Sequence, residues 1–214
     1  MDEVRQNAMK IIDEIGENRL DWFEKLYSNA AGNQYWIPWS DGAPHRFLVE
    51  WNLQIKSRGS ALVVGCGLGE DAAYLCREGW EVTAFDISKS AVEWAKKNHP
   101  NEDIKWMVAD LLNLPNDWKN SFDLVVEVHI LQAIPEPIRI IAAPKLAPLV
   151  KKKGHLVCIG RLSEKEEYID GPPWPLSRSF IDSIGNSLQP VDFVEGNLSS
   201  DEPTTIRFRS VWRK

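Results

Sequence analysis

Helical spacing of apolar residues, interrupted by one irregular stretch, dominates the first 58 residues. Apolar side chains recur at close to the 3.6-residue period of an amphipathic helix from Val4 to Tyr27, with a break around Gly16. Residues 28–44 lose this period and are rich in Asn, Gly, Pro and aromatic residues, which predicts an irregular loop. The helical spacing returns over residues 47–55. We expect a cap of helices and an aromatic loop ahead of the core.

Short apolar runs alternate with helical patterns after residue 59. The pattern predicts strands at 61–64, 81–85, 104–109, 122–128 and 155–160, and helices at 70–77, 91–97 and 138–150. The third helix contains Pro144, a candidate interruption, and the run LVKKKGH indicates a basic helix end stopped by Gly154. A further helix is expected at 179–187, and two late strands, VDFVEG and TTIRFRSVW, are expected to pair antiparallel. This alternation predicts a doubly wound α/β fold with a mostly parallel sheet.

Composition narrows the class of protein. A chain of 214 residues with 43% hydrophobic and 26% charged residues is typical of one soluble domain. Its formal charge of -6 argues against a nucleic-acid partner, and no apolar run reaches the roughly 18 residues of a membrane span. The three cysteines match neither a disulfide framework nor a metal spacing, and the N-terminus lacks a signal-peptide pattern. We therefore expect a cytoplasmic protein with no metal and no membrane contact, either a monomer or a weak homodimer.

The glycine-rich run ALVVGCGLGED is the strongest chemical signal. A buried strand leads directly into Gly65, Gly67 and Gly69 and then into a helix. Such glycines allow a tight turn and the close approach of a ligand to free backbone N–H groups. A dinucleotide fingerprint would need a third glycine where this chain has Glu70, so the spacing favours another nucleotide-type ligand. The alternative is a turn that serves the fold alone.

Acidic residues follow the next three predicted strands. Asp86 ends the second strand, Asp110 follows the third, and Glu127 and His129 end the fourth. Parallel strands bring their carboxyl ends to one edge of the sheet, so these side chains should gather beside the glycine turn. A carboxylate at Asp86 can accept hydrogen bonds from both ribose hydroxyls; capping the next helix is its alternative role, which Ser88 could fill equally well.

These residues resemble the class I S-adenosylmethionine-dependent methyltransferases, in which a G-x-G-x-G turn and acids after the second and third strands recur. The similarity covers roughly residues 60–160. Within that class, the chain is similar to the thiopurine, thiol and halide methyltransferases through its G-C-G turn, through Val63 in place of an acid, and through the stretches WIPWSDG, QAIPEPIR and GPPW. The resemblance implies a seven-stranded Rossmann-like sheet with an N-terminal helical lid. It further implies S-adenosylmethionine as cofactor and S-adenosylhomocysteine as product.

On this resemblance the chain is a single domain over 1–214, with a cap (1–58), a cofactor-binding core (59–161) and a substrate-side part (162–214). The glycine turn would hold the methionine part, Asp86 the ribose, and Ile87, Asp110 and Leu111 the adenine. The full set of implied cofactor-binding residues is Trp22, Trp36, Trp39, Gly65, Cys66, Gly67, Gly69, Asp71, Asp86, Ile87, Asp110, Leu111 and Glu127. Aromatic rings near a cationic sulfonium are physically reasonable.

The acceptor side departs from the family pattern. Relatives often continue the acid after the fourth strand with a basic residue and a Thr, whereas this chain has Glu127-Val128-His129-Ile130. His129 is the candidate general base, because an ordinary His pKa near 6.5 suits proton transfer, and Glu127 is a second catalytic candidate. A structural role for His129 is the alternative. Candidate substrate-binding residues are His45, His129, Arg161 and Trp174.

The expected activity is methyl transfer to a small molecule, a thiol or another soft nucleophile, because a thiolate needs little help from a base. Two other functions stay open at this point. One is a noncatalytic protein that binds S-adenosylmethionine or S-adenosylhomocysteine as a regulator. The other is an NAD-dependent oxidoreductase, which the glycine spacing disfavours.

Overall fold

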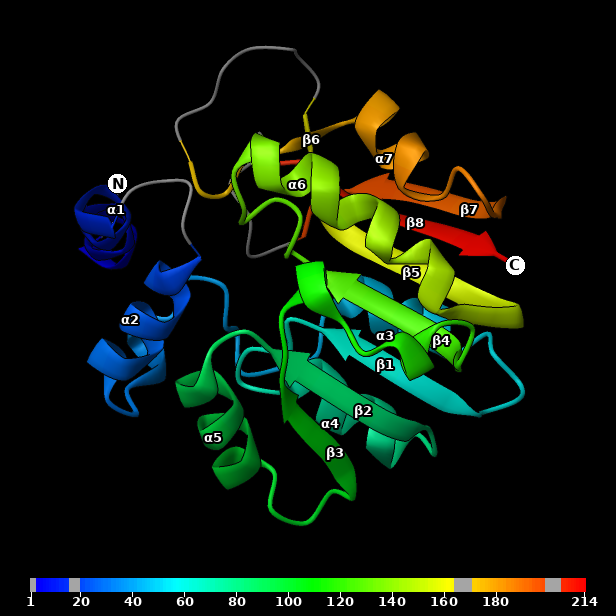
Figure 1. Cartoon of the computed structure of the whole chain (residues 1–214), viewed down its shortest axis with the longest axis horizontal. Coiled ribbons are helices and arrows are strands. Elements are labelled where there is room, and N and C mark those ends of the chain that lie inside the picture. Colours follow the sequence, from blue (N-terminus) through cyan, green and yellow to red (C-terminus); the bar gives the residue numbers. More distant parts are fainter. Residues whose placement is uncertain (1–2, 16–19, 164–170, 199–204) are drawn as a thin grey trace.

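A central sheet organises the computed structural model, which describes residues 3–15, 20–163, 171–198 and 205–214 (Figure 1). Within these residues, seven strands follow one path in the order β3-β2-β1-β4-β5-β8-β7, and the short strand β6 pairs with β5 off this path. The strands are β1 (Ser60–Val64), β2 (Glu81–Asp86), β3 (Ile104–Val108), β4 (Phe122–Val128), β5 (Val150–Ser163), β6 (Leu176–Ser177), β7 (Gln189–Gly196) and β8 (Arg207–Arg213).

Parallel pairing joins the first five strands, as the sequence predicts. The pairs β1–β2, β1–β4, β2–β3 and β4–β5 are parallel, whereas β8 pairs antiparallel with both β5 and β7. The apolar run over residues 61–64 is buried on both faces of the sheet, as central parallel strands require. The doubly wound α/β prediction and the antiparallel pairing of the two late strands are both confirmed.

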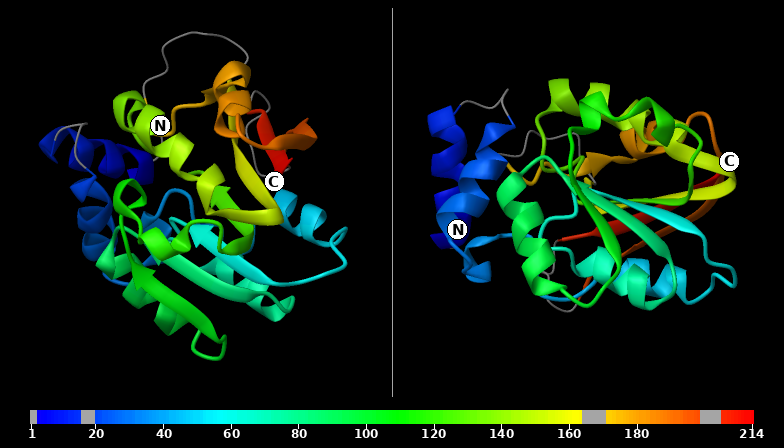
Figure 2. Two further views of the ribbon diagram at one scale, coloured as in Figure 1. Left: turned by 45° about the vertical axis from the view of Figure 1, so that its right-hand side comes forward. Right: turned by 60° about the horizontal axis from the view of Figure 1, so that its bottom comes forward.

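Helices cover both faces of the sheet (Figures 1 and 2). On one face, α3 (Arg46–Asn52) and α4 (Glu70–Arg77) bury Leu48, Trp51 and Leu75 against β1, β2 and β4. On the other face, α6 (Glu136–Ala142) and α7 (Arg178–Ile184) close a second core around Leu156 and Phe208. Helix α5 (Lys89–Asn98) contacts β2 and β3.

The N-terminal segment lies beyond the carboxyl ends of the parallel strands (Figure 1). It consists of α1 (Glu3–Ile15), α2 (Asp21–Ala30) and the 3₁₀ turn η1 (Gln34–Trp36); the expected break at Gly16 lies outside the described residues. The Glu24 carboxylate of α2 accepts hydrogen bonds from the hydroxyls of Ser88 (2.7 Å) and Ser90 (2.6 Å). These contacts hold the cap against the start of α5.

The helix expected over residues 138–150 is interrupted at Pro144, as the sequence suggested, but its bounds are wrong at both ends. Helix α6 starts earlier, at Glu136, and stops at Ala142, after which the chain forms two 3₁₀ turns, η4 (Ala143–Lys145) and η5 (Ala147–Leu149). Pro144 and Pro148 cause this, because each lacks the N–H that an α-helix needs. The basic run at 151–153 belongs to β5 and is not a helix end, and β5 shifts its register against β4 there.

Two more 3₁₀ turns, η2 (Leu111–Asn113) and η3 (Asn116–Trp118), connect β3 to β4. No helix in the described part of the chain combines the length and apolar character needed to cross a membrane.

Candidate functional site

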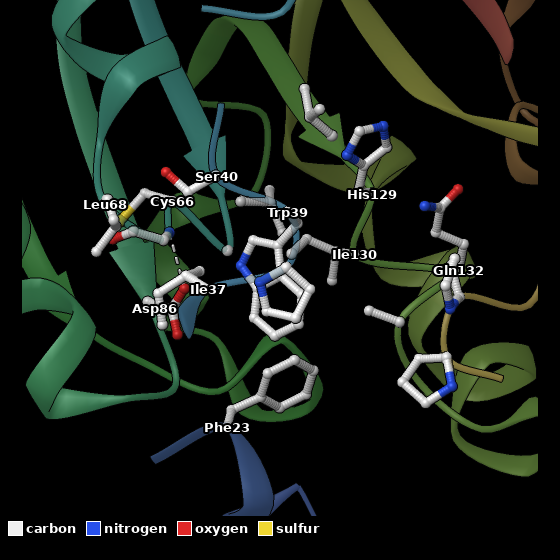
Figure 3. A pocket seen from close by; sticks show the side chains of 18 of the residues that line it. Phe23, Ile37, Trp39, Ser40, Cys66, Leu68, Asp86, His129, Ile130 and Gln132 are labelled. Carbon is white, nitrogen blue, oxygen red and sulfur yellow. Dashed lines mark hydrogen bonds between the residues drawn. The ribbon is translucent and has the colours of Figure 1, made fainter. Parts of the chain in front are cut away.

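A cavity of about 640 Å³ opens at the carboxyl edge of the sheet, under the N-terminal segment. Its walls come from the cap, from the glycine turn after β1, from the ends of β2, β3 and β4, and from the facing ends of β5 and β8. Figure 3 shows Cys66, Asp86 and Leu68 at one side of this cavity, His129 and Gln132 at the opposite side, and Trp39 between them. The strand-end residues that the sequence singled out therefore meet at one hollow.

The glycine turn shapes the first side of the cavity. Gly65 and Gly67 adopt positive φ angles of 60° and 53°, a region that disfavours a side chain. A Cβ at Gly65 would overlap Ile130, and one at Gly67 would lie 3.0 Å from Tyr27 Oη. Both positions therefore need glycine, because the side chains of Ile130 and Tyr27 pack closely on the turn at the cavity wall.

Asp86 lies beside this turn and is 6% exposed. Its two carboxylate oxygens accept backbone N–H bonds from Gly67 (3.0 Å) and Ser88 (2.9 Å). Burial raises the pKa of Asp86 to about 6, although these hydrogen bonds oppose the shift. The cap of α5 comes from Ser88, whose hydroxyl accepts the N–H of Ala91, so Asp86 is not needed for that role.

Other acids surround the same side of the cavity. Asp71 accepts the backbone N–H of His45 (2.8 Å), and burial raises the pKa of Asp71 to about 6. Asp110 accepts the N–H of Leu112 (2.8 Å) at the start of η2. Ile87, with 36% of its surface exposed, adds an apolar patch next to Asp86. This side of the cavity therefore combines negative charge with a small apolar surface.

Aromatic side chains of the cap form the wall facing the glycine turn. Trp39 Nε1 donates a 2.8 Å hydrogen bond to Tyr27 Oη, and Phe23 packs edge-on against Trp39. Burial, together with nearby Asp86, raises the pKa of Tyr27 well above its usual range. Because Tyr27 Oη accepts from Trp39 and stays protonated, its own O–H remains a donor.

His129 forms the opposite side of the cavity. It follows β4 with a φ of 66°, which is unusual for a residue with a Cβ, and its ring lies edge-on to that of His45 at 5.2 Å. Arg207 Nη1 lies 2.9 Å from His129 Nε2, and a guanidinium can only donate, so Nε2 accepts and the ring proton is on Nδ1. Burial, then the positive neighbours His45, Arg207 and Arg161, hold the pKa of His129 well below its usual range.

Glu127 lies beneath the cavity and does not line it. One carboxylate oxygen accepts the backbone N–H groups of Ile130 (2.5 Å) and Leu131 (3.0 Å), and the other accepts the thiol of Cys158 (2.6 Å). Burial raises the pKa of Glu127, and its side chain is 1% exposed. The contacts assign Glu127 to holding the loop that carries His129.

The structure brings twelve of the predicted site residues to the cavity wall: Trp39, His45, Gly65, Cys66, Gly67, Asp71, Asp86, Ile87, Asp110, Leu111, His129 and Arg161. Five others do not line it: Trp22, Trp36, Gly69, Glu127 and Trp174. Trp22 is buried and stacks on Phe23, and Trp174 donates its backbone N–H to the carbonyl of Gln132 (2.8 Å).

Among the lining residues that escape sequence reasoning are Tyr27, Ile130, Gln132 and Arg207. Tyr27 has the spacing of a core position on an amphipathic helix, and Arg207 lies in a strand that the sequence places away from the glycine turn. Gln132 and Ile130 fall in a stretch that the family resemblance covers, but no chemical pattern distinguishes them.

Comparison with known proteins identifies the class that this fold and site define. Residues 62–158 match a family model described as a methyltransferase domain. A solved methyltransferase from Burkholderia thailandensis, the 1,6-didemethyltoxoflavin-N1-methyltransferase with S-adenosylhomocysteine bound, superimposes with a TM-score of 0.72 at 16% identity, covering 98% of this chain and 90% of that one. The chain is a class I S-adenosylmethionine-dependent methyltransferase.

Two relatives of different activity are similar in sequence. One is the probable thiol methyltransferase 2 of Arabidopsis thaliana, 28% identical over 94% of this chain and 88% of the relative. The other is the ubiquinone biosynthesis O-methyltransferase of Coxiella burnetii, 32% identical over 65% of this chain and 62% of that relative. The chain therefore spans less than two thirds of the O-methyltransferase but most of the probable thiol methyltransferase.

We expect binding of S-adenosylhomocysteine to weaken as the pH falls through about 6. Asp86 in the free protein has a pKa of about 6, so above that value it is the carboxylate that can accept ribose hydroxyl donors. Below it the group is protonated, and the dissociation constant should rise by up to about tenfold per pH unit. Calorimetric titration between about pH 5 and pH 8 measures this.

The Asp86→Asn variant is the control for this pH dependence. It should bind S-adenosylhomocysteine more weakly than the wild type at pH 8. It should also lose the pH dependence of the dissociation constant that Asp86 causes. Any pH dependence that survives in the variant belongs to another acid, such as Asp71, whose pKa is also about 6 and which lines the same cavity. A wild-type affinity that stays constant from pH 8 to pH 5 would contradict the assignment of Asp86.

Proposed function

We propose that this chain transfers a methyl group from S-adenosylmethionine to the sulfur of a small thiol that binds as its thiolate. The observation that carries the proposal is the state of His129. Its Nε2 lone pair accepts from Arg207, and its Nδ1 carries the ring proton. The side chain best placed to act as general base thus has no free lone pair. This favours a methyl acceptor that needs no general base.

The cavity wall fits the cofactor in chemistry as well as in size. The backbone at Gly65, Cys66 and Gly67 would contact its methionine part, and the Asp86 carboxylate its ribose. Ile87 and Leu111 would pack on the adenine, with Asp110 at the exocyclic amine. The acidic character of this side suits a ligand that carries a cationic sulfonium and an ammonium group. When bound, S-adenosylmethionine supplies the methyl group and leaves as a neutral thioether.

The residues of the cap would exclude water and orient the reacting groups. Trp39, held by its bond to Tyr27, lies beside the glycine turn, where a Cβ at Gly67 would be 3.9 Å from Trp39 Nε1. An aromatic face near a sulfonium is favourable, and a dry site strengthens the alignment on which a displacement depends. The cap is tied to the core through the bond from Ser40 Oγ to Glu70 (2.8 Å) and through that from His45 N to Asp71.

Positive charge on the side of the cavity that carries His129 supports the proposal that the substrate binds as a thiolate. Arg161 and Arg207 are direct partners across the β5–β8 ladder, and both line the cavity with His129. Guanidinium groups keep their charge at every accessible pH and lower the cost of binding an anion. The sequence similarity to a probable thiol methyltransferase over most of both chains points the same way.

A small thiol is expected to be methylated at a rate that rises with pH until the thiol is ionised. The His129→Asn variant should keep the same pH profile and lose less than about tenfold in kcat/KM, because removal of a true general base costs about a hundredfold or more. Initial rates of S-adenosylhomocysteine formation over about pH 6 to 9 provide the test, with a phenol and an amine of similar size as alternative acceptors.

Two outcomes would overturn this proposal. One is faster turnover of the phenol or the amine than of any thiol. The other is a loss of about a hundredfold in kcat/KM in His129→Asn, together with disappearance of the rise in rate with pH. That result would make His129 a general base. Unchanged binding of S-adenosylhomocysteine in the variant shows that the site is intact.

A further inference from the structure

Gln132 lies in the loop after β4 and is fixed at both its backbone and its side chain. Its backbone carbonyl accepts the N–H of Trp174 (2.8 Å), and its side-chain Oε1 accepts the N–H of Arg161 (2.6 Å). The preceding residues Ile130 and Leu131 are in turn held by the carboxylate of Glu127. Gln132 is therefore positioned by three separate segments of the chain.

These contacts determine which way the amide faces. An N–H group can only donate, so the atom that meets Arg161 N must be the amide oxygen, and the NH₂ group is on the other side. A Cβ at Gly160 would lie 2.9 Å from Oε1, so the glycine leaves room for this orientation. Among the described residues, none accepts a hydrogen bond from Gln132 Nε2, although Gln132 is only 5% exposed.

The surface that Gln132 does expose belongs to the cavity that it lines. Figure 3 shows it on the same side as His129, across the cavity from Asp86 and Cys66. The groups that line this side, the Nδ1–H of His129, the Gln132 amide and the guanidinium groups of Arg161 and Arg207, are hydrogen-bond donors. An NH₂ group that faces a binding cavity and lacks a protein acceptor costs free energy when a substrate displaces water from it without supplying an acceptor.

We propose that Gln132 determines acceptor specificity by donating a hydrogen bond to an acceptor atom next to the nucleophile of the substrate. The substrate class is a thiol that carries a lone-pair atom, such as a ring nitrogen, beside its sulfur. Substrates that present only C–H or N–H groups at that position leave the amide unsatisfied and bind less well. The inference rests on the proposed thiol methylation only for the choice of probes.

The test compares pyrimidine-2-thiol with thiophenol, which have the same shape and differ in the two ring atoms beside the C–S bond. Both bind as thiolates, and in pyrimidine-2-thiolate the ring nitrogens carry lone pairs and no N–H. The protein is wild type, Gln132→Met or Gln132→Glu, with Gln54→Glu on the exposed surface as a matched control. Gln132→Glu keeps an oxygen for the Arg161 N–H and replaces the donor by an acceptor; assays at about pH 8.5 keep the introduced carboxyl ionised. Each probe is compared between wild type and variant, so its intrinsic reactivity cancels.

We expect both Gln132 variants to lower kcat/KM for pyrimidine-2-thiol by about 10- to 100-fold, mainly through KM. In Gln132→Met, thiophenol should change by less than about threefold, so the preference between the two probes collapses. In Gln132→Glu the new carboxylate repels both thiolates, and the preference is again lost because no donor remains for a ring nitrogen. The affinity for S-adenosylhomocysteine should stay at the wild-type value. An equal loss for both probes would mean a purely structural role, and no loss for either would mean that Gln132 does not meet the substrate; both results overturn the inference.

A binding experiment separates this inference from the proposed function. Each probe is titrated calorimetrically into protein that is saturated with S-adenosylhomocysteine, so no methyl transfer is required. If the wild type prefers pyrimidine-2-thiol and the variants do not, the role of Gln132 stands even where no thiol is turned over, and only the proposed thiol methylation fails. Equal affinity of the wild type for both probes, or no measurable binding of either, overturns the role of Gln132.

Discussion

The Asp86→Ala variant is expected to bind S-adenosylhomocysteine about 100-fold more weakly than the wild type at pH 8. The carboxylate already accepts one backbone N–H on each oxygen and lies at the cavity wall beside the glycine turn. Hydrogen bonds to a charged group contribute about 1.5 to 3 kcal/mol each, so the loss of two ribose contacts corresponds to a hundredfold change or more. Calorimetric titration of the purified variant measures the dissociation constant.

Two control variants define what the Asp86 result means. Asp117→Asn removes an exposed carboxylate at η3, far along the chain from the turn, and should leave the affinity unchanged. Asp86→Asn keeps the size of the side chain and should fall between wild type and Asp86→Ala, because its amide oxygen still accepts one bond. Wild-type affinity in Asp86→Ala would show that the ribose is held elsewhere.

The Glu127→Leu variant is expected to lower the free energy of unfolding by about 3 kcal/mol. Glu127 is the acceptor for two backbone N–H groups and one thiol in a region that water does not reach. Leucine leaves the N–H groups of Ile130 and Leu131 unsatisfied, at about 1 to 3 kcal/mol each, and this cost exceeds what the variant regains by not burying a carboxylate. Urea denaturation followed by circular dichroism measures the change.

Glu127→Gln separates the acceptor role from the charge. Its amide oxygen can still accept from the N–H groups of Ile130 and Leu131. The free energy of unfolding should therefore fall by no more than about 1 kcal/mol relative to wild type. Glu195→Leu, on exposed strand β7, should be close to neutral. If Glu127→Leu is as stable as the wild type, the loop that carries His129 and Gln132 does not depend on this carboxylate.

The site illustrates where sequence reasoning succeeds. The glycines at 65, 67 and 69 follow a strand whose apolar run marks it as buried, and Asp86 ends the next strand. In a parallel sheet the carboxyl ends of adjacent strands meet, so positions along the chain suffice to bring Asp86 to the turn. The Gly67 N–H to Asp86 bond of 3.0 Å is the result.

Sequence reasoning stops where contacts join distant parts of the chain through side chains. His129 and Arg207 are 78 residues apart, and their hydrogen bond depends on β8 lying antiparallel beside β5. That pairing turns a candidate general base into a hydrogen-bond acceptor. Likewise, Glu127 turns away from the cavity because the thiol of Cys158 on β5 and two backbone N–H groups surround its carboxylate.

The sequence by itself determined the doubly wound fold, the glycine turn and the acid after β2, because each depends on local periodicity or on the order of strands. The class of enzyme followed from the resemblance of these motifs to a known family. Only the tertiary structure decided the protonation of His129, the direction of the Gln132 amide and the absence of Trp174 and Glu127 from the described cavity wall. The reason is physical: a side chain's charge and orientation depend on burial and on hydrogen-bond partners, which are fixed only when remote segments pack together.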